Sequence, residues 1–157
     1  MNNANAIEEF YKAFQEGDPV RMESFYDKAI QFEDPAFGQL KGKEAGAMWA
    51  MLLSRKDSEL KIEYGKVSAE GSFGSAEWKA TYKYGPKKRT VVNNIKSRFE
   101  FQDGKIIKQT DSFDLWNWSR QALGPVGLFL GWAPFFQDKI RRMARKSLYS
   151  YMKKNNR

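Results

Sequence analysis

The chain has 157 residues, of which 41% are hydrophobic and 15% aromatic, so we expect one packed domain rather than a disordered segment. It contains no cysteine and no histidine, which excludes disulfides, thiolate nucleophiles, imidazole bases and metal sites built on those side chains. The formal net charge is +8, but every acidic residue lies at or before Asp138, so the basic character belongs to the C-terminal tail. We expect no signal peptide, no membrane-spanning stretch and a cytoplasmic location.

Helical spacing dominates the start of the chain. Apolar residues at steps of three and four predict a helix over 4–16, and the Gly-Asp-Pro stretch at 17–19 ends it. Asp18 is expected to cap a second helix, with a proline at its first position. The residues that this second helix is expected to turn inward are Met22, Phe25 and Tyr26.

The next segment carries a short strand, a loop and a third helix. The strand is predicted over 29–33, and the stretch FEDPAFGQLKG that overlaps its end reads as an acidic turn followed by a loop. An apolar pattern of helical period then predicts a helix over 43–54.

From residue 59 the apolar pattern changes to a period of two, which predicts antiparallel strands. Strands are expected at 60–64, 76–84 and 90–102, and an Asp-Gly turn leads into a last strand over 105–113. Helices first and strands after them predict an α+β fold with the helices on one face of a curved sheet. The polar residues that the alternation turns inward are Asn93, Ser97, Gln109 and Asp111.

The C-terminal part is helical again. A short helix is predicted over 115–123, an almost wholly apolar segment covers 126–132, and an amphipathic helix with cations on one face covers 135–154. We expect the apolar segment to cover the entrance of a pocket or a neighbouring subunit. Contact of the basic helix with a membrane surface is a less favoured alternative, and nucleic-acid binding is not expected. The residues of the last helix expected to pack inward are Ile140, Met143, Leu148 and Tyr151.

Several segments together resemble one known superfamily: EGDPVRMESFYDKAIQFEDP, LKGKEA, EWKATYKY, RTVVNNIKSRFEFQDGKI and TDSFDLW. Their order over residues 4–116 resembles the nuclear transport factor 2-like superfamily, in particular its SnoaL-like and ketosteroid isomerase-like branch, and the C-terminal segment looks like that of a bacterial subgroup. The resemblance implies an α+β cone, in which helices pack on a strongly bent, mostly antiparallel sheet around a pocket for a small apolar molecule. Residues 1–116 would form the cone domain and 117–157 a C-terminal helical extension of it. A homodimer is also expected, because relatives commonly dimerise.

The resemblance assigns a role to the acid of the -EDP- motif. In ketosteroid isomerase-like members this residue is the general base, and the spacing carries the role to Asp34. Burial in an apolar pocket raises the pKa of a carboxylate and suits it to take and return a proton. The alternative is a carboxylate that only caps the turn before Pro35. The family's oxyanion-hole tyrosine falls on Phe10, with Tyr11 about 100° further around the helix, and its strand acid falls on Ser97. These departures argue against a steroid isomerase.

The predicted site is therefore a carboxylate pair in an aromatic pocket. Asp111 is the predicted acidic partner of Asp34, with helix capping as its alternative role, and Asn93, Ser97 and Gln109 are predicted to orient a substrate. Limonene epoxide hydrolase-like members pair their acids with an inward arginine, but the alternation places Arg98 outside. The rings expected to line the pocket are Tyr11, Phe14, Trp49, Trp78, Tyr82 and Phe113.

We expect an isomerase, cyclase or hydrolase of a small molecule that needs no metal or other cofactor. One alternative is a non-catalytic module that binds a ligand or a partner chain. A second alternative is a membrane-surface or assembly protein that acts through residues 126–154.

Overall fold

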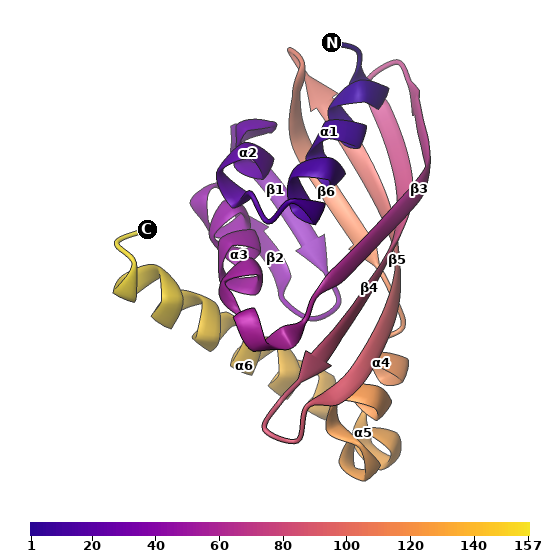
Figure 1. Cartoon of the computed structure of the whole chain (residues 1–157), viewed down its shortest axis with the longest axis vertical. Coiled ribbons are helices and arrows are strands. Elements are labelled where there is room, and N and C mark those ends of the chain that lie inside the picture. Colours follow the sequence, from indigo (N-terminus) through magenta and orange to yellow (C-terminus); the bar gives the residue numbers. More distant parts are fainter.

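The computed structural model describes all 157 residues, which form a six-stranded sheet, helices on its inner face and a C-terminal helical segment (Figure 1). In chain order the elements are α1 (Asn3–Gln15), α2 (Pro19–Ser24), β1 (Tyr26–Asp34), β2 (Gly38–Lys41), α3 (Lys43–Ser54), the 3₁₀ turn η1 (Lys56–Ser58), β3 (Lys61–Glu70), β4 (Phe73–Tyr84), β5 (Arg89–Gln102), β6 (Lys105–Ser112), α4 (Leu115–Leu123), α5 (Pro125–Leu130) and α6 (Pro134–Lys154). None of these helices combines the length and the apolar character needed to cross a bilayer.

The sheet has the strand order β2-β1-β6-β5-β4-β3. Strands β1 and β6 run parallel, and every other neighbouring pair is antiparallel. The register shifts in β3 between Gly65 and Ser68 and at the β5–β6 pair between Glu100 and Phe101, and such irregularities bend a sheet. The predicted α+β architecture with a bent, mostly antiparallel sheet is confirmed.

The core lies between the concave face of the sheet and helices α1 and α3 (Figure 1). Helix α1 crosses β4 so closely that a Cβ added to Gly74 would lie 2.6 Å from Cδ1 of Ile7. Large side chains fill the space behind this contact, and many of the aromatic residues of the chain belong to this core. The largest fully buried rings belong to Trp49, Tyr11, Phe10, Phe32 and Phe99.

The region around the -EDP- motif differs from the sequence prediction. Helix α2 ends at Ser24, and Tyr26 begins β1, with its side chain on the same buried face as Ile30 and Phe32. The prediction of Tyr26 as a helical residue is therefore wrong. Residues 38–41 form the short strand β2 instead of a loop, because a tight turn folds them back onto β1 so that Gly38 lies opposite Asp34.

The C-terminal segment is attached to the sheet through α4, whose bounds match the predicted helix. Strand β6 ends at Ser112, so the first residues of β5 lack a strand neighbour on that side. The side chain of Gln121 supplies the hydrogen bonds that a neighbouring strand would make. Its Oε1 accepts from Val92 N at 2.8 Å, and its Nε2 donates to Val92 O at 3.1 Å. Helix α5 then packs against α4, where a Cβ on Gly127 would overlap the carbonyl of Ser119.

Helix α6 runs back along α3 and the β1–β2 turn (Figure 1). Its anchor is Leu148, which is fully buried, and the guanidinium of Arg145 donates to the carbonyl of Phe37 at 2.6 Å. The prediction that Met143 packs inward is wrong. Met143 is 61% exposed, because it lies about 140° around the helix from Leu148.

Candidate functional site

The two predicted carboxylates lie on neighbouring strands and face the same way. Strands β1 and β6 run parallel, with Phe32 opposite Gln109. Asp34 follows Phe32 by two residues, and Asp111 follows Gln109 by two. Since side chains two apart project from one face of a strand, both carboxylates project from the buried face that carries Phe32 and Gln109.

Asp111 is almost completely buried, and two side chains donate to its Oδ1 atom. The donors are the Ser97 hydroxyl at 2.6 Å and Nε2 of Gln109 at 3.1 Å. Burial raises the pKa of Asp111 to about 7; the two hydrogen bonds oppose this rise, and the charge of Asp34 adds to it. The pKa of one carboxylate therefore responds to the charge of the other.

Ser97 links Asp111 to two aromatic side chains. The Tyr11 hydroxyl and Nε1 of Trp78 each donate to Ser97 Oγ at 2.9 Å. A hydroxyl has one proton and two lone pairs, so Ser97 accepts from both rings and gives its only proton to Asp111. Tyr11 lies about 100° around helix α1 from Phe10. Its hydroxyl is nevertheless buried inside the protein.

Gln109 forms a second chain of hydrogen bonds to the same oxygen. Nε1 of Trp49 donates to the Tyr26 hydroxyl at 2.9 Å, and this hydroxyl donates to Oε1 of Gln109 at 2.6 Å. Every donor in both chains points toward Asp111, and aligned donors of this kind strengthen one another. Sequence reasoning missed Tyr26, although it stands four residues before Ile30 on the same alternating face.

Asp34 lies at the end of β1, half-buried. Its Oδ1 accepts from Phe37 N at 2.6 Å, so the turn-capping alternative describes one of its oxygens correctly. Burial raises the pKa of Asp34 to about 6, against the hydrogen bonds from the turn and the positive charge of Arg141.

Arg141 was not predicted as part of this site, because it comes from α6, more than a hundred residues along the chain. Its Nε donates to the carbonyl of Pro35 at 3.1 Å, beside Asp34. The only arginine that sequence reasoning weighed, Arg98, is exposed on the outer face of β5, as the alternation predicts.

Two polar groups on the inner face keep unused hydrogen-bonding capacity. Asn93 is 8% exposed and its amide has no partner in the protein, and Oδ2 of Asp111 has none either. No fully buried side-chain nitrogen or oxygen in the chain lacks a partner. The unpaired atoms of Asn93 and Asp111 therefore each keep a small exposed surface, where water can supply the missing hydrogen bond.

Most of the rings predicted to line the pocket are packed core residues. Trp49 makes edge contacts with Phe14 and Trp78, with ring centroids 5.0 and 6.1 Å apart, and Tyr11 stacks on Tyr64. Phe14 also lines a hollow of about 240 Å³ at the ends of α1 and α3 that neither carboxylate lines.

Tyr82 and Phe113 are less enclosed than the other predicted rings. Both are partly buried, and the Tyr82 hydroxyl accepts from Nε1 of Trp118 at 2.6 Å. Burial raises the pKa of Tyr82 to about 12, and the charge of Asp34 adds to the rise, so this ring lies within the electrostatic reach of Asp34. No group of three His, Cys, Asp or Glu side chains lies close enough together to hold a metal ion.

Solved structures with the same fold come from several bacteria. A LEH-like epoxide hydrolase from M. tuberculosis is 25% identical with a TM-score of 0.58, over 81% of this chain and 94% of that chain. A putative polyketide cyclase from Xanthomonas campestris pv. campestris is 22% identical with a TM-score of 0.60, over 74% and 93%. Another putative polyketide cyclase, from Pseudomonas putida KT2440, is 19% identical with a TM-score of 0.63, over 78% and 98%.

A comparison with curated proteins finds no match. A model of the SnoaL-like domain matches residues 7–109, which span α1 through Gln109 on β6 and so hold most of the network around Asp111. All six strands and the inward polar residues lie within the matched residues or directly after them. The chain therefore belongs to the SnoaL-like domain family.

Proposed function

We propose that this chain is an enzyme that moves protons on a small apolar molecule, as an isomerase, cyclase or hydrolase without a cofactor. One observation carries the proposal: two carboxylates project from the same buried face of neighbouring strands, with pKa values raised to about 6 and about 7. Carboxylates with such values exchange protons readily near neutral pH, whereas ordinary surface carboxylates do not.

The two pKa values give the carboxylates different roles. Asp34, with the lower pKa, is ionised at neutral pH and acts as the general base. Asp111, with the higher pKa, holds its proton more tightly and acts as the general acid. The charge of Asp34 adds to the raised pKa of Asp111, so ionised Asp34 favours the protonated form of Asp111. Activity should rise with pH near 6, as Asp34 loses its proton, and fall above about 7, as Asp111 loses its own.

The other polar residues support this chemistry in two ways. The Ser97 hydroxyl and Nε2 of Gln109 both donate to Asp111, so these residues position the acid and do not hold the substrate. The free amide of Asn93 would bind a carbonyl or hydroxyl of the substrate. The neighbours named as putative polyketide cyclases and as an epoxide hydrolase favour ketones and epoxides as the first compounds to test.

The test is exchange of carbon-bound protons. A panel of apolar ketones is incubated with the protein in D₂O, and epoxides are incubated in H₂¹⁸O. Mass spectrometry then measures uptake of either isotope. Asp34→Asn should reduce the rate by at least about 100-fold, the size of a general-base contribution. Glu33→Gln is the matched control, because Glu33 is the exposed neighbour on the same strand. Equal rates in wild type and Asp34→Asn would rule the proposal out.

The competing function is a non-catalytic ligand-binding module, which the dense packing of Tyr11, Trp49 and Trp78 favours. It predicts compounds that raise the melting temperature of the chain but take up no isotope. Their affinity would be the same in Asp34→Asn as in wild type.

A further inference from the structure

The C-terminal segment exposes several large apolar side chains. The apolar tip, defined as Val126, Phe129, Trp132 and Phe135, lies on α5, the turn after it and the start of α6. These side chains are 53%, 70%, 62% and 66% exposed, respectively. Exposed aromatic and aliphatic side chains that follow one another along a surface segment in this way are typical of a docking site.

Helix α6 continues the apolar tip with a row of cations. Lys139, Arg142, Lys146 and Lys153 are all exposed and follow Phe135 at helical spacing. At 100° per residue they fall within about 60° of one another around the helix axis, so they form one basic stripe. No acidic residue occurs after Asp138, which is itself paired with Arg141 at 2.7 Å.

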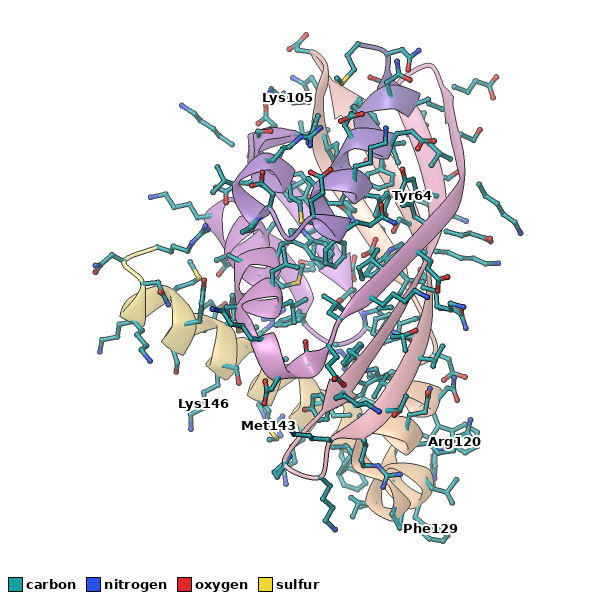
Figure 2. All side chains as sticks on the ribbon, in the orientation of Figure 1. Tyr64, Lys105, Arg120, Phe129, Met143 and Lys146 are labelled. Atoms are coloured by element: carbon teal, nitrogen blue, oxygen red, sulfur yellow. The ribbon has the colours of Figure 1, made fainter.

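The apolar tip and the basic stripe face the same side of the molecule. Figure 2 shows Phe129 projecting from the end of α5, and Met143 and Lys146 projecting from α6 along the same lower edge, away from the sheet. The opposite face of α6 carries its buried anchor, Leu148, which holds this orientation. The surface therefore combines apolar side chains with a flanking field of positive charge.

We propose that the apolar tip and the basic stripe dock onto the surface of an anionic lipid bilayer. Aromatic side chains settle at the boundary between headgroups and acyl chains, and aliphatic ones enter the acyl layer. The cations of the stripe then lie at the level of anionic headgroups, which attract them. The hollow of Lys87, Arg89 and Arg120, beside α4, adds cations next to α5.

Charge disfavours a second copy of the chain as the occupant. A two-fold symmetric interface places the same surface patch of both copies against each other. The basic stripes would then meet one another, and like charges in contact oppose association. A lipid surface supplies the opposite charge and also accepts Val126 and the rings without a specific pocket.

Co-sedimentation with vesicles tests the proposal. The full chain should bind vesicles of phosphatidylcholine with about 30% phosphatidylserine at least tenfold more tightly than vesicles of phosphatidylcholine alone. Raising the salt from about 0.1 to about 0.5 M should reduce this preference, because salt screens surface charges. Lys139→Gln/Arg142→Gln/Lys146→Gln should weaken binding at least tenfold, since each cation near an anionic membrane contributes about fivefold.

Matched control variants distinguish binding through this surface from nonspecific effects of positive charge and of exposed apolar side chains. Lys61→Gln/Lys66→Gln/Lys96→Gln removes the same charge from exposed strand residues and should leave binding unchanged. Phe129→Ser/Trp132→Ser should weaken binding at least tenfold, whereas Val20→Ser/Phe73→Ser, at exposed apolar sites elsewhere, should not.

Three results would overturn the proposal. The first is no preference for anionic vesicles, and the second is an equal loss of vesicle binding in the variants and their controls. The third is a dimer in light scattering that Phe129→Ser/Trp132→Ser dissociates, while vesicle binding is absent. The last of these would assign the surface to a second copy of the chain.

Discussion

The interior of the cone and the C-terminal segment are both rich in aromatic residues, yet they use them in opposite ways. Inside, Trp49 touches four other rings and donates its indole proton to Tyr26. Outside, Phe129 and Trp132 contribute exposed rings to the apolar tip. The contrast indicates that the stability of the fold resides in the cone, whereas the tip is free to serve an external surface.

Removing an interior ring should have the largest effect. Trp49→Ala deletes the centre of the aromatic cluster and leaves the Tyr26 hydroxyl without its donor. We expect the free energy of unfolding in urea to fall by about 4 kcal/mol, as for other buried tryptophans. A loss below about 1 kcal/mol would mean that the interior is not the main source of stability.

Neutralising the buried carboxylate should have an effect that depends on pH. The pKa of Asp111 is about 7 in the folded protein against an ordinary aspartate value of 3.8, so the folded state binds this proton more tightly. The contribution of Asp111 to stability is therefore present below pH 4 and is lost as the pH rises toward and through 7. Asp111→Asn removes this loss, because an amide does not ionise.

We expect Asp111→Asn to unfold with a higher free energy than wild type at pH 8, by about 4 kcal/mol at most, and with a similar one at pH 4. Urea titrations at both pH values measure this difference. Asp103→Asn, on an exposed turn, is the control and should give parallel curves. A variant less stable than wild type at pH 8 would contradict the burial of an ionised group.

Loosening α6 should have a smaller effect, confined to one region. Leu148→Ala deletes the one fully buried side chain of the helix, for which we expect a loss of about 2 kcal/mol, at the low end for a buried leucine. Hydrogen exchange should accelerate in α6 and leave β5 protected. Uniform acceleration throughout the sheet would show that the two regions unfold together.

Changing the apolar tip should have the smallest effect on stability. Phe129→Ser/Trp132→Ser removes side chains with few contacts, so the free energy of unfolding should stay within about 0.5 kcal/mol of wild type. Thermal unfolding monitored by circular dichroism measures it. A larger loss would show that the tip packs on the chain and is not available to a partner.

Sequence reasoning works best where one local pattern decides the structure. Helices α3 and α4 have the predicted bounds, because their apolar periodicity and flanking breakers act within a few residues. The alternation in β5 and β6 likewise identified Asn93, Ser97, Gln109 and Asp111, all of which are buried.

Features that depend on distant partners escaped prediction. Strand β2 is four residues long and forms only because β1 offers it a partner. Arg141 reaches Asp34 from another part of the chain, and the direction of each proton in the network around Asp111 follows from side-chain rotamers that no periodicity encodes.

The pairing of Gln121 with Val92 protects the fold against misassembly. Strand β5 has 14 residues and β6 only 8, so part of β5 would otherwise present an open edge to other chains. A primary amide presents an N–H donor and a carbonyl acceptor side by side, as a peptide group does, and so covers this part of the edge of β5 without adding a strand. The match to the family stops at residue 109, before this plug. A chain shortened to end at Ser112 would keep all six strands but leave the first residues of β5 without this cover, so we expect it to aggregate more readily than the full chain.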